Sequence, residues 1–306
     1  MVALIKEVKW LILGGDGQLG RAMNLELSRK SLPFISLTRK QLDITNQRDI
    51  NKWFSEVTPN VVLNAAAWTD VDLAETMRSE ATLVNAVGPK LLAAACLEIR
   101  AKFIHISTDY VFSGAKISPW DEDAKKFPAS VYGETKAEGE KAVLSVFASG
   151  SFIVRTSWLY SPWGKNFVKT ILKIALRETR SVEVVSDQIG QPTSAIELAK
   201  QIHTLISQNA SPGIYHGTSS GQTSWYELAR YIFELVGADP MRVIDVDSMR
   251  FPSKVKRPNY SVLGHNRWLE EGLETMKDWK ESLKDALPAI LHSLEREEFL
   301  LENRRT

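Results

Sequence analysis

The chain has 306 residues, of which 44% are hydrophobic and 25% charged, the composition of an ordinary globular protein. Its 38 Lys and Arg residues nearly balance 37 Asp and Glu residues, which argues against nucleic acid or an anionic membrane surface as a partner. No apolar run reaches the roughly 18 residues of a membrane span, so we expect a cytoplasmic protein with no membrane partner.

In the first half of the chain, short apolar runs alternate with helical patterns. The expected strands are 10–13, 34–37, 60–63, 103–106 and 152–154. The expected helices are 19–29, 49–57, 79–99 and 130–146, and the third has a break near Gly88 and Pro89. That helix also holds the single cysteine, Cys96, which we expect to be a small buried side chain. The alternation predicts an α/β fold, a doubly wound parallel sheet of Rossmann-like type with helices on both faces.

The second half is less regular and is predicted to be an addition to the first. We expect strands at 182–185 and 214–216 and helices at 194–207, 224–236 and 280–295. Ser224 and Glu227, three residues apart at the start of one helix, predict a capping box. We therefore predict a sheet domain at 1–157, to which the chain returns at about 182–218. A smaller, mainly helical domain at 158–306 is interleaved with it.

A glycine loop follows the first expected strand and opens the first helix. Gly14, Gly17 and Gly20 form a Gly-x-x-Gly-x-x-Gly pattern, a spacing variant of the dinucleotide-binding fingerprint. Glycine allows a tight turn and close approach of the backbone to a pyrophosphate, and the helix N-terminus offers free N–H groups to the anion. The pattern alone is common, but its place after the first strand of an alternating fold favours a nicotinamide dinucleotide.

The residues after the second expected strand bear on the choice of cofactor. An acidic residue there would accept the ribose hydroxyl of NAD, whereas this chain has Thr38, Arg39 and Lys40. Arg39 is suited to a 2′-phosphate, which favours NADPH and leaves NADH possible. The alternative is that Arg39 and Lys40 are solvated loop charges.

Tyr132 and Lys136 are four residues apart and share one face of an expected helix. A phenol is a poor acid–base catalyst at neutral pH, and a nearby ammonium is expected to lower the pKa of the phenol. The segment 107–112, which begins with Ser107 and Thr108, follows the strand at 103–106 and lies where parallel sheets hold their ligands. We expect His105, inside that strand, to face the core.

These motifs resemble the extended short-chain dehydrogenases/reductases over nearly the whole chain. The matching segments are the glycine loop, 42–44, 64–72, 74–75, 107–112, 132–136 with Gly139 and Glu140, 155–160, 166–167, 187–193 and 257–263. Within that family the segments at 107–112 and 155–158 resemble the rhamnose branch, whose members reduce the C4 keto group of a dTDP-linked 6-deoxy sugar. The resemblance implies that 1–157 binds NAD(P) and that 158–306 binds mainly the nucleotide-sugar substrate.

The resemblance also implies residue roles on the substrate side. Tyr132 protonates the alkoxide, Lys136 holds the nicotinamide ribose and biases Tyr132, and Thr108 polarises the carbonyl oxygen. Asp109 and Tyr110 line the sugar pocket, and Trp158 packs against the substrate.

On the cofactor side, the implied contacts to the pyrophosphate come from Gly17, Gln18 and Leu19. Asp43 and Ile44 lie at the adenine side, and Ala67, Trp68 and Thr69 lie along the middle of the cofactor. Thr38 stands where some relatives carry an acid, which again favours NADPH. Asn85, on the long helix, is expected to support the site.

Several further expectations concern ions and partners. Candidate cations for the diphosphate are Lys165, Lys169, Lys254 and Arg257, and each has a surface role as its alternative. Some family members dimerise through carboxylates that share magnesium, so a homodimer is possible. Glu197 is one candidate ligand, but a solvated helix face explains it better and we predict no metal site.

Two other functions remain open on the sequence. One is an enzyme for another nucleotide sugar on the same scaffold, either an epimerase or a reductase. The other is a non-catalytic NADP-binding protein, like the regulatory subunit of methionine adenosyltransferase, which shares the scaffold. The presence of Thr108, Tyr132 and Lys136 favours an enzyme.

Overall fold

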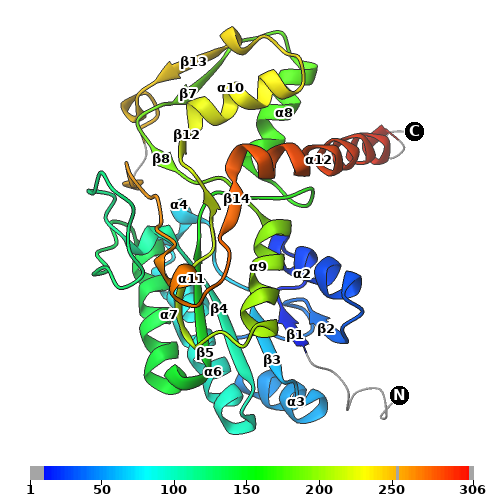
Figure 1. Ribbon diagram of the computed structural model, residues 1–306, viewed down its shortest axis with the longest axis vertical. Helices are drawn as coiled ribbons and strands as arrows, with labels where there is room; N and C mark the ends of the chain where they lie inside the picture. The colour runs from blue at the N-terminus through cyan, green and yellow to red at the C-terminus, as the bar shows by residue number, and fades with distance from the viewer. Residues whose placement is uncertain (1–9, 253–254, 303–306) are drawn as a thin grey trace.

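A computed structural model describes residues 10–252 and 255–302. Six strands form its main sheet: β1 (Trp10–Leu13), β2 (Phe34–Leu37), β3 (Val61–Asn64), β4 (Lys102–Thr108), β5 (Ser151–Thr156) and β10 (Gly213–His216). They lie in the order β10-β5-β4-β3-β1-β2, and every neighbouring pair is parallel. The expected doubly wound parallel sheet is therefore confirmed, and it forms the lower lobe in Figure 1.

The two faces of the sheet are covered by different helices. Trp10 and Ile12 of β1 share a core cluster with α2 (Gln18–Arg29) and α9 (Ala195–Ser207). Leu11 and Leu13 point to the opposite face, because successive side chains of a strand alternate, and pack with α3 (Gln47–Val57), α6 (Gly88–Ile99) and α7 (Val131–Phe147). All four residues of β1 are buried, which explains why the strand is an unbroken apolar run.

The long helix expected at 79–99 is one helical run with a local change of pitch. It consists of α5 (Arg78–Thr82), a π-helical turn (Leu83–Val87) and α6, and the predicted break coincides with the end of that turn. The run is long and apolar enough to cross a membrane by length and composition alone, but a core helix passes the same test. Its buried residues include Leu92 and Cys96 in the core cluster beneath α7, and Cys96 is fully buried as expected.

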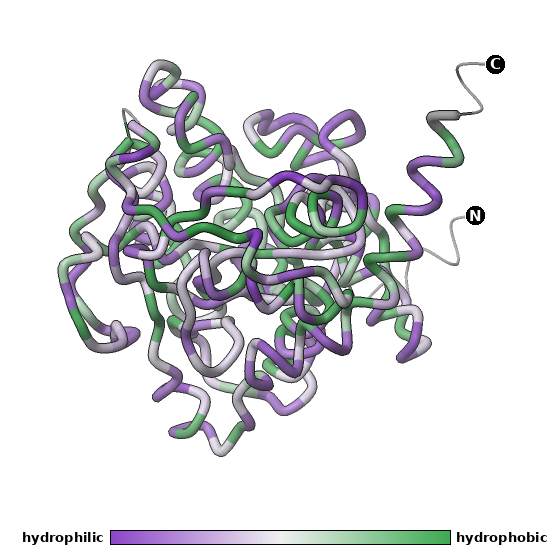
Figure 2. The backbone as a smooth tube through the Cα atoms, turned by 90° about the horizontal axis from the view of Figure 1, so that it is seen from above, coloured by the Kyte–Doolittle hydropathy of each residue, from purple (hydrophilic) through white to green (hydrophobic). Residues whose placement is uncertain are grey.

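A smaller lobe lies above the sheet in Figure 1. Its core is shared by α8 (Phe167–Arg177), α10 (Trp225–Leu235), α12 (Trp279–Glu302) and the parallel pair β7 (Val182–Val185) and β13 (Val243–Val246). The predicted capping box starts α10, where the hydroxyl of Ser224 accepts from the backbone N–H of Glu227 at 3.0 Å. Figure 2 shows the last turns of α12 projecting beyond the rest of the molecule.

Short elements connect the two lobes. They are α4 (Val71–Ala74), β6 (Leu159–Tyr160), β8 (Ile189–Gly190), β9 (Thr193–Ser194), β11 (Ser219–Ser220), β12 (Thr223–Ser224), α11 (Asn266–Glu270) and β14 (Met276–Asp278). The expected strand at 182–185 exists, but it pairs with β13 and not with the main sheet. The chain therefore returns to the sheet later than predicted, beginning at α9. The domain boundary at 157 stays a prediction.

Candidate active site

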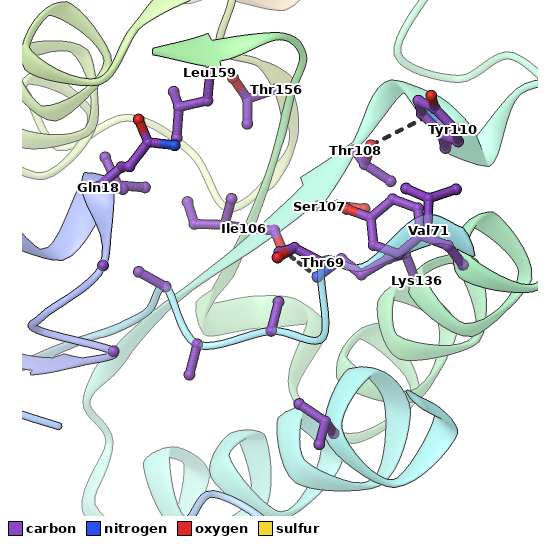
Figure 3. A pocket seen from close by; sticks show the side chains of 18 of the residues that line it. Gln18, Thr69, Val71, Ile106, Ser107, Thr108, Tyr110, Lys136, Thr156 and Leu159 are labelled. Atoms are coloured by element: carbon purple, nitrogen blue, oxygen red, sulfur yellow. Dashed lines mark hydrogen bonds between the residues drawn. The ribbon is translucent and has the colours of Figure 1, made fainter. Parts of the chain in front are cut away.

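The carboxyl ends of β1 and β3 lie side by side, at the place where the strand order of the sheet reverses direction. In doubly wound sheets such a switch point is where ligands bind. A cavity of about 620 Å³ opens there, and it is lined by segments from both lobes. Figure 3 shows Gln18 on one side of this cavity and Thr108, Tyr110 and Lys136 on the other.

The glycine loop forms one wall of the cavity. Gly14 has a φ of +79°, in the left-handed region that favours glycine, and a Cβ there would lie 2.8 Å from the backbone N of Ala66. A Cβ on Gly20 would lie 2.2 Å from the carbonyl oxygen of Gly14, so Gly20 lets α2 pack against the turn without lining the cavity. Gly17 lines the cavity at the start of α2, whose first N–H groups have no side-chain cap. The loop therefore offers backbone donors to an anion.

Gln18 connects the glycine loop to the small lobe. Its side-chain oxygen accepts hydrogen bonds from Ser161 Oγ at 2.9 Å and from Asn166 Nδ2 at 3.2 Å. Asn166 also caps α8, because its side chain accepts from the backbone N–H of Lys169. One cofactor-loop residue thus fixes the first turn of a small-lobe helix.

The far end of the cavity holds the residues expected at the adenosine. Arg39, Asp43 and Ile44 line it, and the Arg39 side chain is 79% exposed with Nε 3.8 Å from Asp43 Oδ2. Burial alone raises the pKa of Asp43, but hydrogen bonds from Thr45 and the charge of Arg39 lower it below the ordinary value. Thr38 does not line the cavity and bonds Gln41 instead. Arg39 is therefore an exposed cation at this end of the cavity, beside the carboxylate of Asp43.

The middle of the cavity is bounded by the segment after β3. Ala67 and Thr69 line the cavity, whereas Trp68 does not, and its indole packs near Tyr132. Asn85 holds this segment in place, since its side chain accepts from the backbone N–H of Trp68 at 2.9 Å and donates to Trp68 O at 3.1 Å. Asn85 also donates to Thr135 Oγ1 on α7. The π-helical turn thus places the side-chain amide of Asn85 between the segment after β3 and α7, and the amide bonds both.

Tyr132 stands on the first turn of α7, opposite the end of β4. Burial raises the pKa of Tyr132 to about 12, a hydrogen bond with Thr108 lowers it, and the charge of Asp109 raises it. Asp109 is itself buried, which raises the pKa of its carboxyl group to about 6 despite hydrogen bonds from Ser261 and Thr108. Thr108 Oγ1 donates to Asp109 Oδ1 at 2.9 Å. Tyr132 therefore carries a proton at neutral pH and can act as an acid.

Lys136 lies one turn further along α7 and is almost completely buried. Burial lowers the pKa of Lys136 to about 8, although the charge of Glu140 raises it. Its ammonium donates to the carbonyl oxygen of Ile106 at 2.6 Å. The sequence predicts that Lys136 lowers the pKa of Tyr132, but in the free protein burial dominates that pKa and raises it.

Trp158 forms the small-lobe side of the cavity in a strained backbone conformation. Its φ is +45°, uncommon for a residue with a bulky side chain. The indole stacks on Trp225 with ring centroids 3.5 Å apart and planes at 11°, and it also lies against Gly190, where a Cβ would be 2.5 Å from the ring. Trp225 lines this cavity and also a second one, so the stacked pair separates two chambers.

The second cavity, of about 1280 Å³, is lined mainly by the small lobe, including the segment after β13, and Asp72 of α4 also lies on its wall. Apolar and basic groups share its wall: Phe167, Ile171, Val184, Phe251, Lys256 and Arg257. Of the four cations considered for a diphosphate, Arg257 lines this cavity and pairs with Asp72 at 3.2 Å. Lys165 is exposed and lines neither cavity. Lys169 is buried, and its ammonium donates to the carbonyl oxygen of Pro162. Lys254 lies outside the described residues.

Ser107, in the segment expected at the ligand, does line the first cavity, but several other lining residues were not predicted as site residues. They are Asp16, Leu42, Ala65, Ala66, Val71, Val84, Ile106, Thr156, Ser157, Leu159 and Trp225. Some are neighbours of predicted residues, and the strand ends give a signal for those. Trp225 has no such signal, because 67 residues separate it from Trp158 along the chain.

Glu197, the candidate magnesium ligand, pairs with Lys200 at 2.6 Å on α9. Within residues 10–252 and 255–302, no group of three or more His, Cys, Asp or Glu side chains is placed to hold a metal ion.

The chain is similar over most of its length to known proteins. The family model described as RmlD substrate binding domain matches residues 8–291. A dTDP-4-keto-6-deoxy-D-glucose reductase of Streptomyces niveus is 43% identical, over 92% of this chain and 97% of that protein. A dTDP-4-dehydrorhamnose reductase of Streptomyces griseus is 42% identical, over 92% of this chain and 94% of its own.

A solved structure shares the whole architecture. The dTDP-4-dehydrorhamnose reductase of Bacillus anthracis strain Ames, in complex with NADP, superposes with a TM-score of 0.87 at 36% identity. The match covers 92% of this chain and 99% of that one. Both lobes are therefore shared with that protein, including the part of the chain that carries the second cavity.

Proposed function

The chain belongs to the RmlD substrate binding domain family and is a nicotinamide-dependent oxidoreductase, and from this premise we propose that it reduces dTDP-4-dehydro-6-deoxy-L-mannose to dTDP-L-rhamnose with NADPH. The resemblance to the extended short-chain dehydrogenases/reductases is thus confirmed. One observation carries the proposal: Thr108, Tyr132 and Lys136 share a cavity with the glycine loop.

The residues of the cavity fit a nicotinamide dinucleotide. Gly17, Gln18 and Leu19 offer backbone donors for a pyrophosphate, and Arg39 supplies a cation where the adenosine would end. An ammonium has three donors, and Lys136 uses one of them on Ile106 O, which leaves others for a ribose hydroxyl. We also assign Gly14 and Gly20 to the turn, Asp43 and Ile44 to the adenine side, and Ala67 and Thr69 to the middle of the cofactor. Trp68 and Thr38, which the sequence also placed at the cofactor, do not line the cavity; Trp68 acts through the backbone that Asn85 holds, and Thr38 leaves the adenosine end without a carboxylate at that position.

The bound reduced nicotinamide supplies the hydride. Tyr132 donates its phenolic proton to the oxygen at C4 as that oxygen becomes an alkoxide, and Thr108 donates a hydrogen bond to the same oxygen. In the free protein Thr108 donates to Asp109 instead, so its hydroxyl must turn when substrate arrives. Asp109 and Tyr110 border the sugar beside these groups, and Trp158 covers its apolar face.

We assign the second cavity to the nucleotide part of the substrate. Its apolar wall suits a pyrimidine base, and Arg257 offers a guanidinium for the diphosphate next to the shared wall at Trp225. This assignment makes the small lobe at 158–306 the main substrate-binding part and the sheet domain at 1–157 the NADP-binding part. We further propose that the enzyme works in the cytoplasm, without nucleic-acid or membrane partners, and that it assembles as a homodimer.

The decisive experiment follows NADPH oxidation with dTDP-4-keto-6-deoxy-L-sugar, with the UDP-linked sugar in parallel. We expect turnover with the dTDP sugar and little with the UDP sugar. Reduction of the UDP sugar alone would point to another nucleotide-sugar enzyme. NADPH binding without any turnover would favour a non-catalytic NADP-binding protein. The 43% identity to a dTDP-4-keto-6-deoxy-D-glucose reductase makes the corresponding D-sugar the third substrate to test.

Arg39 gives a test of cofactor choice. We expect Arg39→Ala to raise the KM for NADPH roughly tenfold, because a charge-assisted bond to the 2′-phosphate is lost, and to leave the KM for NADH nearly unchanged. Steady-state kinetics with both cofactors measure this. Lys40→Ala is the matched control, since Lys40 is also exposed but does not line the cavity. An equal rise for NADPH and NADH in Arg39→Ala would refute the phosphate contact.

A further inference from the structure

One face of α7 presents three chemically active residues toward β4. They are spaced four apart and are Tyr132, Lys136 and Glu140. The first bonds Thr108, the second donates to Ile106 O at 2.6 Å, and the third accepts from Ser107 Oγ at 2.5 Å. Three consecutive residues at the end of β4 are thus each held by this face. The mechanism above uses the first two contacts and leaves the third unexplained.

Glu140 is fully buried and carries a charge. Its carboxylate accepts from Arg155 Nε at 2.9 Å and from Arg155 NH2 at 2.8 Å, and Lys126 Nζ lies 3.0 Å away. Burial raises the pKa of Glu140, but the bonds and charges of Arg155 and Lys126 outweigh burial and lower the pKa to about 2. A buried, ionised carboxylate therefore stands one helical turn from Lys136.

The other groups around Glu140 do not supply a second buried anion beside Lys136. His105, from β4, and His216, from β10, both have pKa values lowered by burial and stay neutral. Glu122 is partly buried, and its side chain accepts from the backbone N–H of Arg267 while its carbonyl oxygen accepts from Arg155 NH1. Asp109 lies at the Tyr132 end, and the remaining charged neighbours, Arg155 and Lys126, are cations.

We propose that Glu140 is a positioning residue that acts through Lys136: its buried charge keeps Lys136 protonated, and its bond to Ser107 fixes the strand end that carries Thr108. The consequence is electrostatic. A cation at position 136 is costly without a nearby anion, because burial disfavours its charged form. The proposal rests on the proposed function for the reaction it serves, but the charge of Lys136 can also be followed through NADPH binding alone.

The test compares two variants of this cluster, one that removes a negative charge and one that removes a positive charge. Glu140→Gln removes the anion, so Lys136 should lose its proton at lower pH. In the pH profiles of kcat and of NADPH affinity, we expect the decline at alkaline pH, the alkaline limb, to begin about one pH unit lower than in the wild type. At a pH on that limb, both values should then be roughly tenfold lower than in the wild type. Lys126→Met removes a cation that competes for Glu140, and both limbs should move up. Lys126 is 28% exposed, which favours a folded variant.

The outcomes separate the electrostatic role from a structural one. Opposite shifts of the two limbs support the proposal, whereas shifts in the same direction, or an equal loss in Glu140→Gln at every pH, overturn it. Glu140→Asp keeps the negative charge, so its alkaline limb should lie between those of Glu140→Gln and the wild type. Glu297→Gln, at an ion pair with Lys169 away from the site, should leave the limb in place.

If Glu140→Gln does not fold, Lys126→Met decides alone: an upward shift supports the proposal, and an unchanged or lower limb refutes it. A wild type that binds NADPH without reducing any sugar contradicts the proposed function. A wild-type limb that Glu140→Gln leaves unmoved contradicts this inference.

Discussion

Replacing Tyr132 with Phe is expected to lower kcat by about 10²–10⁴-fold, the usual contribution of a positioned acid. The Tyr132 phenol shares the cavity with Thr108 and Lys136 and forms a hydrogen bond with Thr108, and burial holds its pKa at about 12, so its proton is present throughout the neutral range. Phe keeps the ring that packs edge-on against Tyr110, with centroids 5.6 Å apart. The loss should therefore fall on the chemical step, which single-turnover kinetics measure.

Two companion measurements make that expectation specific. The affinity of Tyr132→Phe for NADPH should stay within about threefold of the wild type, because the hydroxyl is assigned to the sugar oxygen. Tyr110→Phe removes a neighbouring hydroxyl and serves as the matched control, with a much smaller effect on kcat. Equal rates in wild type and Tyr132→Phe would remove Tyr132 from the mechanism.

Replacing Lys136 with Met should damage both binding and catalysis. Lys136 is assigned to the ribose and to the proton transfer, so we expect kcat to fall by about 10²-fold or more and NADPH to bind at least tenfold more weakly. Fluorescence titration with NADPH and steady-state rates separate the two effects. Met fills similar volume, so the helix face that packs on β4 remains occupied.

The pH dependence of NADPH binding tests whether the charge of the Lys136 ammonium is the cause of tight binding. Burial lowers the pKa of Lys136 to about 8, so in the free protein the proton is present below pH 8 and is lost above it. Binding that needs the charged form should therefore weaken about tenfold per pH unit above 8 in the wild type. Lys136→Met should bind weakly with no such slope. An unchanged slope in the variant would assign the ionisation to another group.

The main sheet could be predicted because the signals that identify its strands lie within short stretches of the sequence. β1, β3 and β5 are buried on both faces, and each contains an apolar run, at 10–13, 61–63 and 152–154, that marks it as a strand. The glycine loop must follow the first strand for the turn to form. Tyr132 and Lys136 fall on one helix face by spacing alone. Residues next to strand ends reach the same edge of the sheet, so Thr108 and the segment after β3 were predictable as neighbours.

What the sequence did not reveal depends on contacts between distant segments. The stack of Trp158 on Trp225 joins two segments that are far apart along the chain, and neither indole has a local pattern that identifies its partner. The strand at 182–185 was placed with the wrong sheet because a short apolar run does not indicate which neighbour it pairs with; its partner β13 was not predicted at all. The sequence assigns no role to Glu140 beyond a matching segment, because Arg155 and Ser107, which surround its carboxylate, lie 15 and 33 residues away along the chain.

The bond from Ser161 and Asn166 to the side chain of Gln18 limits how freely the two lobes can be recombined. A chimera that joins the sheet of one relative to the small lobe of another would inherit the acceptor from one parent and its two donors from the other. Asn166 caps α8, whose residues line the second cavity, so a mismatch at the glycine loop would disturb the wall of a cavity in the other lobe. Gln18, Ser161 and Asn166 would therefore have to be exchanged together in any such chimera.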